Sequence, residues 1–260
     1  MSISEFGLER ILVWLLVFSR TAGIFTVAPV LGNAHVPVVT RVGLAACLAL
    51  IFTPLVASGN PAVPTDILGL TFAIVKETAV GLAIGFIGTM LFMAIQSAAE
   101  MIDLQMGLGF SSLVDPTSHQ NISVIGQFYF LTATLLFLSV NGHHMLIQGL
   151  GDSFTTLPIG HLHFSPHATG SLMHIFTRLF VAAIKIAGPI VGVILLTDTA
   201  LGILARTVPQ LNVLVVGFPA KIFVGLVTVI VAMPAVFMVM HNLFGGFSND
   251  IHVLTMALAR

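Results

Sequence analysis

Charged residues are scarce in this chain of 260 residues, because only 7% are Asp, Glu, Lys or Arg. Soluble domains carry about 25% charged residues, so this chain must bury most of its surface in lipid or against other protein. The formal net charge of −1 gives no bulk electrostatic attraction to nucleic acid. The single cysteine, Cys47, excludes a disulfide framework and a thiolate metal cluster.

Motifs of catalysis and nucleotide use are also missing. The sequence contains no G-x-x-x-x-G-K-[ST] loop, no H-E-x-x-H and no G-x-S-x-G, which argues against a nucleotide hydrolase, a metalloprotease and a serine hydrolase. Glu100 and Asp103 share a helix face, but no base or nucleophile lies beside them in sequence. We therefore predict that the chain is not an enzyme and uses no cofactor.

Histidines offer the remaining candidates for a metal site. The segment 141–170 holds His143 with His144, and His161 with His163 and His167. Such tracts can bind metal, but Asp152 is the only acid in the segment. We favour a polar, water-facing loop and predict no metal.

Apolar residues dominate the rest of the chain, at 57% of the sequence and a mean hydropathy of +1.08. Stretches long enough to cross a bilayer recur, and segments rich in turn-forming residues separate them. These features predict an all-α polytopic membrane protein with about six long, Gly- and Pro-interrupted helices arranged as hairpins. The predicted helices cover 11–31, 42–58, 67–98, 122–140, 172–197 and 211–241, and the gaps cover 32–37, 59–64, 115–121, 141–170 and 206–210.

Ionisable residues and glycines inside the apolar runs indicate helices that pack against protein. Charges at bilayer depth are costly and should face protein or water. Gly81, Gly85 and Gly88 lie near one helix face, which permits close helix contact. An ordinary kinked bundle is the alternative. The ionisable residues concerned are Arg20, Lys76, Glu77, Arg178, Lys185, Asp198 and Lys221.

Two segments carry the most unusual mixture of residues. The segment 100–117 follows a predicted helix of roughly 48 Å at 1.5 Å per residue, which exceeds a bilayer core of about 30 Å. It is either a surface loop or backbone that lines a protein cavity. In the segment 198–213, Asp198 and Arg206 flank a helical turn region, and Pro209 just after Arg206 marks the bend of the hairpin. They would pair within the helical hairpin or with a neighbouring chain.

These segments resemble the FliR family of flagellar biosynthetic proteins. The first block is E-x-x-D-x-Q-M-G at 100–107, with Asp115-Pro116 and Gln127. The second block is Leu138 with Asn141-Gly142-His143-His144. The third block is D-x-x-L-G-x-x-x-R-x-x-P-Q-x-N-V at 198–213, with G-x-P-x-K at 217–221. The N-terminal segment Phe18 to Gly23 with Pro29 also fits, so the resemblance covers essentially the whole chain.

The resemblance implies a core subunit of a flagellar type III export gate in the bacterial inner membrane, at the flagellar basal body. It implies FliP-like and FliQ-like partners, an FlhB-like subunit, unfolded export substrates and contact with membrane lipid. Residues 1–170 would correspond to a FliP-like part, and residues 171–260 to a FliQ-like hairpin.

The resemblance also places a pore plug at about 106–121. Its apolar side chains would form a seal, its glycines would let the backbone move, and proline would fix the return of the chain. The plug residues are Met106, Gly107, Leu108, Gly109, Phe110, Leu113, Val114, Asp115 and Pro116. We expect polar contacts between subunits or within helices at Glu100, Asp103, Gln105, Asp198, Arg206 and Lys221.

Two other functions remain open from the sequence. One is the homologous subunit of a virulence-type injectisome, since these blocks are shared broadly. The other is a secondary transporter that uses Glu100, Asp103, Lys185 and Lys221 as coupling groups.

Overall fold

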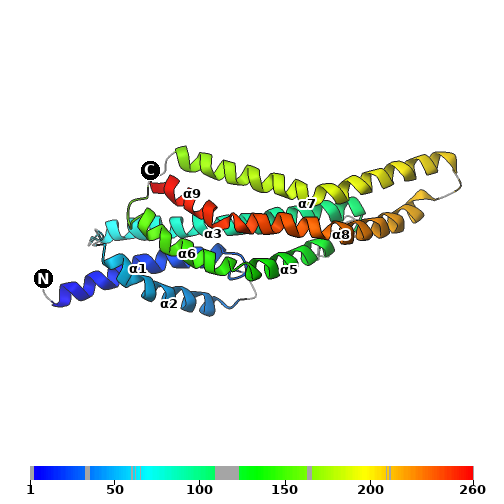
Figure 1. Ribbon diagram of the computed structural model, residues 1–260. Helices are drawn as coiled ribbons and strands as arrows, with labels where there is room; N and C mark the ends of the chain where they lie inside the picture. The colour runs from blue at the N-terminus through cyan, green and yellow to red at the C-terminus, as the bar shows by residue number, and fades with distance from the viewer. Residues whose placement is uncertain are drawn as a thin grey trace. The chain divides into compact units, whose positions relative to one another are not determined.

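The computed structural model of the chain describes residues 3–32, 36–59, 61, 63–64, 66–108, 123–162, 166–208, 210 and 212–259. Within these ranges every regular element is an α-helix, as predicted. The helices are α1 (Ile3–Val27), α2 (Val38–Ala57), α3 (Ile67–Met106), α5 (Val124–Ser139), α6 (Gly142–Thr156), α7 (Pro166–Thr207), α8 (Val213–Gly245) and α9 (Phe247–Ala259) (Figure 1).

Five stretches of the described chain are long and apolar enough to cross a membrane, and six if α5 and α6 together count as one. This confirms the predicted class of an all-α polytopic membrane protein. Several helices continue through proline, at Pro54 in α2, at Pro189 in α7, and at Pro219 and Pro234 in α8. Helix α3 reaches Met106 and is 40 residues long, so it extends beyond the predicted end at residue 98.

Two helices contradict the sequence prediction. The segment 141–170 is not a turn-rich gap, because it contains α6 and the start of α7. Helix α9 lies after residue 241, where no helix was predicted. Both missed helices are short and amphipathic, with buried residues at helical spacing such as Leu146, Leu150 and Phe154 in α6. A search for long apolar runs overlooks such helices because polar residues interrupt each run.

The described helices form two compact units. Unit 1 comprises Met1–Met90, Asn141–Phe176 and Gly246–Arg260, and unit 2 comprises Leu91–Val140 and Thr177–Gly245. In unit 1, α1 packs on α2 and α6 packs on α9; in unit 2, α5 packs on α8 (Figure 1). Long helices α3 and α7 contribute residues to both units.

Glycines bring α1 and α3 into close contact inside unit 1. A Cβ added at Gly81 would overlap the carbonyl oxygen of Arg20, and one at Gly85 would lie 2.7 Å from that of Ile24. The hydroxyl of Thr89 donates a hydrogen bond to the carbonyl of Val27. The glycine face predicted on α3 is therefore a helix contact face, and a larger residue would force the backbones apart.

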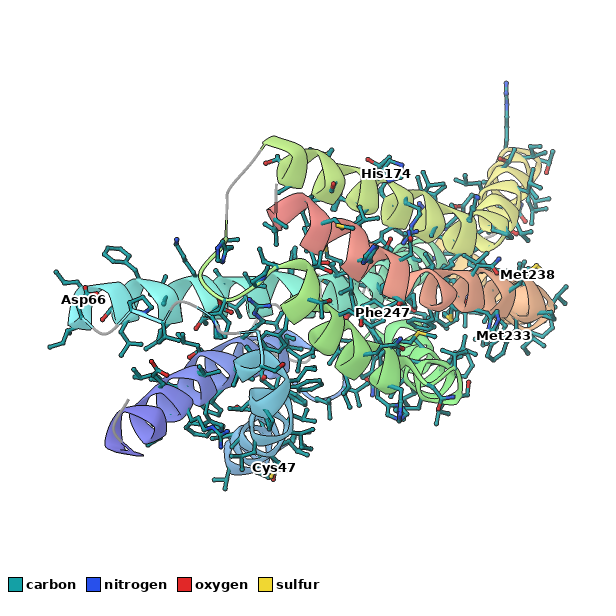
Figure 2. All side chains as sticks on the ribbon, turned by 60° about the vertical axis from the view of Figure 1, so that its left-hand side comes forward. Cys47, Asp66, His174, Met233, Met238 and Phe247 are labelled. Carbon is teal, nitrogen blue, oxygen red and sulfur yellow. The ribbon has the colours of Figure 1, made fainter. Side chains whose placement is uncertain are left out.

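Apolar side chains also cover much of the outer surface of individual helices. In α2, only Ala45 and Ala49 are buried, and in α8, Phe223 is 70% and Ile230 is 72% exposed. Figure 2 shows Cys47 of α2 and Met238 of α8 projecting outward from their helices. Surfaces this apolar require lipid or a protein partner.

Candidate functional site

The first part of the predicted plug lies at the C-terminal end of α3. Gly107 has a φ of +83°, in the left-handed region that glycine adopts without steric cost. The N–H of Gly107 donates to the carbonyl of Leu104 at 3.2 Å, and the N–H of Leu108 donates to the carbonyl of Asp103 at 3.0 Å. This pair of bonds is a Schellman cap, so Gly107 ends the long helix.

Helix α8 packs tightly against this end within unit 2. A Cβ added at Gly107 would lie 2.7 Å from Cδ1 of Phe218, and one at Gly225 would lie 2.7 Å from Cε of Met106. Met106 is fully buried, so in this structure its side chain fills a helix contact. Gly109, Phe110, Leu113, Val114, Asp115 and Pro116 lie outside the described residues, and the plug assignment stays a prediction.

Asp103 connects α3 to the start of α5. Its carboxylate is buried and accepts hydrogen bonds from the Ser123 hydroxyl and, at 3.3 Å, from the N–H of Ile125. The Ser123 oxygen in turn accepts the N–H of Gly126 at 2.7 Å and caps α5. One carboxylate therefore holds the two chain segments that flank residues 109–122.

Glu100 and Gln105 are the other polar residues of α3 that were predicted as contacts. Glu100 is exposed and accepts a hydrogen bond from the side-chain amide of Gln96 at 3.2 Å, one turn earlier in the helix. Gln105 is half-buried near the helix end. The sequence drew attention to Asp103 but not to Ser123, whose signal is its position directly before an apolar run.

Two of the three charged residues predicted as contacts in the C-terminal hairpin form an ion pair. Lys221 Nζ of α8 lies 2.6 Å from Asp198 Oδ1 of α7, and both side chains are partly exposed. Arg206 is exposed in the last turn of α7. The structure therefore pairs Asp198 within the hairpin, while a partner-chain role for these residues stays a prediction.

One extensive polar contact among the described residues is a pair that the sequence did not identify. Arg20 of α1 and Glu77 of α3 are fully buried in unit 1, with Arg20 Nε 2.6 Å from Glu77 Oε2. They are 57 residues apart in the chain. Each was recognised as an ionisable residue within an apolar run, and both face protein as the cost of burying charge demands.

The remaining donors of Arg20 bind α6 and the residue after it. The guanidinium donates to the carbonyl and hydroxyl of Ser153, both at 3.1 Å, and to the carbonyl of Leu157 at 3.0 Å. The ring of Phe154 lies 4.4 Å from its central carbon, a cation–π distance. Arg20 therefore satisfies carbonyls at the C-terminal end of α6, where a cation is favoured.

The turn after α6 completes the arrangement around Glu77. The N–H of Gly160 donates to Glu77 Oε1 at 3.0 Å, and Gly160 has a φ of +83°. Lys76 Nζ lies 3.4 Å from the Gly160 carbonyl. This cluster ties α1, α3 and the end of α6 together.

Histidines form no larger cluster in the part of the chain that the structure describes. No group of three or more His, Cys, Asp or Glu residues is placed there to hold a metal ion. The rings of His143 and His144 lie 5.6 Å apart, and His161 Nδ1 lies 3.0 Å from the Ile159 carbonyl. His163 and the side chain of His167 lie outside the described residues.

These observations define the class of protein: an all-α polytopic membrane protein with a buried ion pair and a capped long helix. The chain belongs to the family of bacterial export proteins, family 1, whose profile matches residues 11–247, and within it to the FliR proteins.

Relatives align over most of the chain. It is 38% identical over 239 residues to the flagellar biosynthetic protein FliR of Bacillus subtilis (89% of this chain, 90% of the relative). It is 34% identical over 245 residues to FliR of Escherichia coli (93% of each). It is 29% identical over 224 residues to the Yop proteins translocation protein T of Yersinia pestis (84% of this chain, 85% of the relative).

Proposed function

We propose that this chain is a core, non-catalytic subunit of a bacterial flagellar type III protein-export gate in the inner membrane, at the flagellar basal body. The observation that carries the proposal is similarity along nearly the whole chain, over residues 11–247, to a family of export proteins. The two flagellar relatives are 38% and 34% identical. The gate would pass unfolded flagellar proteins.

The proposed partners are FliP-like, FliQ-like and FlhB-like subunits. The apolar outer surfaces of α2 and α8 support this, because they need protein or lipid to cover them. Residues 1–170 would correspond to a FliP-like part and residues 171–260 to a FliQ-like hairpin. In such an assembly, Glu100, Gln105 and Arg206 are available for polar contacts between subunits.

The segment 106–121 would act as the plug of the gate. A resting gate must hold back ions yet let an unfolded chain through, and apolar constrictions can close a pore by excluding water. Described residues bound this segment on both sides: Gly107 ends α3 in the left-handed conformation, and Asp103 holds the start of α5.

Two changes test the plug. Deletion of residues 108–114 should leave assembly intact and make membranes leak small ions when the complex is overproduced. Gly107→Asp should instead impair export. Its side chain would meet the Phe218 ring, and a residue other than glycine is strained in the left-handed backbone conformation of this position. If the deletion variant assembles fully and leaks no more than the parent, the segment is not the plug.

A virulence-type injectisome subunit is the second candidate, because the Yersinia translocation protein is 29% identical over 84% of the chain. Deletion of the gene separates the two systems. Loss of flagellar protein secretion and motility supports the flagellar function, whereas loss of effector secretion in a motile cell supports the injectisome. A secondary transporter would instead show transport by the purified chain alone.

A further inference from the structure

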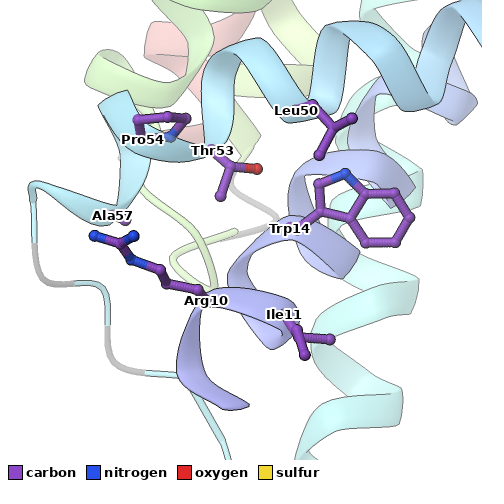
Figure 3. Close-up of a pocket in the computed structure, with 7 residues that line it drawn as sticks. All are labelled: Arg10, Ile11, Trp14, Leu50, Thr53, Pro54 and Ala57. Atoms are coloured by element: carbon purple, nitrogen blue, oxygen red, sulfur yellow. The ribbon is translucent and has the colours of Figure 1, made fainter. Parts of the chain in front are cut away.

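A pocket between α1 and α2 has the chemistry of a lipid site. It lies within unit 1, has a volume of about 360 Å³, and is lined by Arg10, Ile11, Trp14, Leu50, Thr53, Pro54 and Ala57 (Figure 3). This volume falls in the range of small-molecule pockets, about 300–1,000 Å³. The proposed gate function assigns no role to it.

The charged end of the pocket coincides with the ends of two candidate membrane spans. The first span begins at Glu9 and the second ends at Ala57, and Figure 3 shows the guanidinium of Arg10 beside Ala57. Arginine at the end of a span lies at the depth of lipid headgroups. Arg10 is also engaged elsewhere in the chain, but a guanidinium carries five N–H donors.

Trp14 supplies a second donor one helical turn from Arg10. Its ring stacks on Phe18, with centroids 5.4 Å apart and an interplanar angle of 15°. Among the described residues, no acceptor lies within hydrogen-bonding distance of the buried Trp14 Nε1–H. The Nε1 atom is covered by protein, so an acceptor in the pocket reaches it once the Trp14 side chain turns toward the pocket.

The rest of the wall is apolar and open on one side. Ile11 is 61% and Leu50 is 62% exposed, and both lie within the candidate spans, below the charged end. A ligand that suits this gradient has an anionic head and an apolar tail. Basic sites between membrane helices are suited to anionic headgroups in this way.

We propose that this pocket binds one anionic phospholipid, with its phosphate at Arg10, an oxygen of the phosphate or ester near Trp14, and an acyl chain along Ile11 and Leu50. The proposal does not depend on the gate function, because it requires only a membrane-embedded chain. Lipid retention and complex yield are separate measurements, so failure of one proposal is distinguishable from failure of the other.

Native mass spectrometry of the purified complex, with added phosphatidylglycerol, phosphatidylcholine or inorganic phosphate, tests the site. We expect Arg10→Gln to lower phosphatidylglycerol retention about ten-fold, the effect of one charge-assisted contact. Trp14→Phe, which keeps the stacked ring but removes the N–H, should lower it by about three-fold or more. Lys185→Gln, which removes an exposed cation of α7 outside the pocket, is the matched control and should change nothing.

A second variant guards against failure of Arg10→Gln to assemble. Ala57→Phe keeps the charge but fills the cavity, and it should also lose the lipid while the complex yield stays at the parent level. Equal retention by the parent, Arg10→Gln and Ala57→Phe would overturn the proposal. So would the absence of any phosphatidylglycerol adduct, equal binding of phosphatidylcholine, or displacement by inorganic phosphate.

Discussion

The buried pair of Arg20 and Glu77 gives the sharpest prediction about stability. Glu77→Ala removes the carboxylate 2.6 Å from Arg20 Nε and the acceptor of the Gly160 N–H. The guanidinium would keep its bonds to Ser153 and Leu157 but would lose its counter-charge in a fully buried site. Its positive charge would then be buried without compensation.

The expected loss follows from measured buried pairs. Removing one partner of such a pair costs about 3–5 kcal/mol, which is a large share of the stability of most domains. At about 2–4 °C per kcal/mol for chains of 150–250 residues, the melting temperature should fall by roughly 6–20 °C. Replacing both residues by Met should cost less, because an apolar pair removes the charge imbalance, although Ser153, Leu157 and Gly160 would lose partners.

The measurement is thermal denaturation of the purified, detergent-solubilised complex, for Glu77→Ala and for a double-mutant cycle of Arg20→Met, Glu77→Met and the two combined. Lys76→Met is the matched control, because Lys76 is the adjacent but exposed cation, and it should leave the melting temperature unchanged. A fall for Glu77→Ala no larger than that for Lys76→Met would refute the reasoning. A double variant as unstable as the sum of the single variants would refute the coupling.

Three further changes test other contacts. Gly81→Ala should destabilise the complex by about 1–3 kcal/mol, because its Cβ would meet the backbone of α1. Gly188→Ala is the control, because nothing lies within 4 Å of the added Cβ. It should be neutral or stabilise the complex by up to about 1 kcal/mol. Gly107→Ala should cost about 1–2 kcal/mol and lower export in a secretion assay; wild-type secretion would contradict the role of its backbone. Lys221→Glu should reduce complex yield slightly, since partly exposed pairs contribute about 0–1 kcal/mol. Adding Asp198→Lys to the same chain should restore the yield. No recovery of the yield would show that another contact dominates.

Long apolar helices were predictable because lipid-facing and protein-facing residues are both apolar. Composition alone marks such runs, and no periodic pattern is required. The glycine face of α3 was also predictable, since Gly81 and Gly85 recur at helical spacing in a long apolar run.

Helices α6 and α9 could not be found in the same way. They carry polar residues such as Asp152 and Asp250, and their stability comes from packing on each other and on the rest of unit 1. Tertiary contacts of this kind are not encoded in a hydropathy window.

The pairing of Arg20 with Glu77 illustrates a second limit. The sequence shows several charges of opposite sign within apolar runs. It does not show which of them pair, because this depends on how the helices pack. Ser123 is similar, because its link to Asp103 depends on where α5 begins relative to the end of α3.

The most direct test of the proposed function is affinity purification of this chain from native membranes, with identification of every co-purifying protein. We predict that FliP-like and FliQ-like subunits co-purify in one detergent-stable complex that survives size-exclusion chromatography. Recovery of the chain as a monodisperse, well-folded monomer that does not bind these subunits would contradict the proposal that it is a core subunit of an export gate.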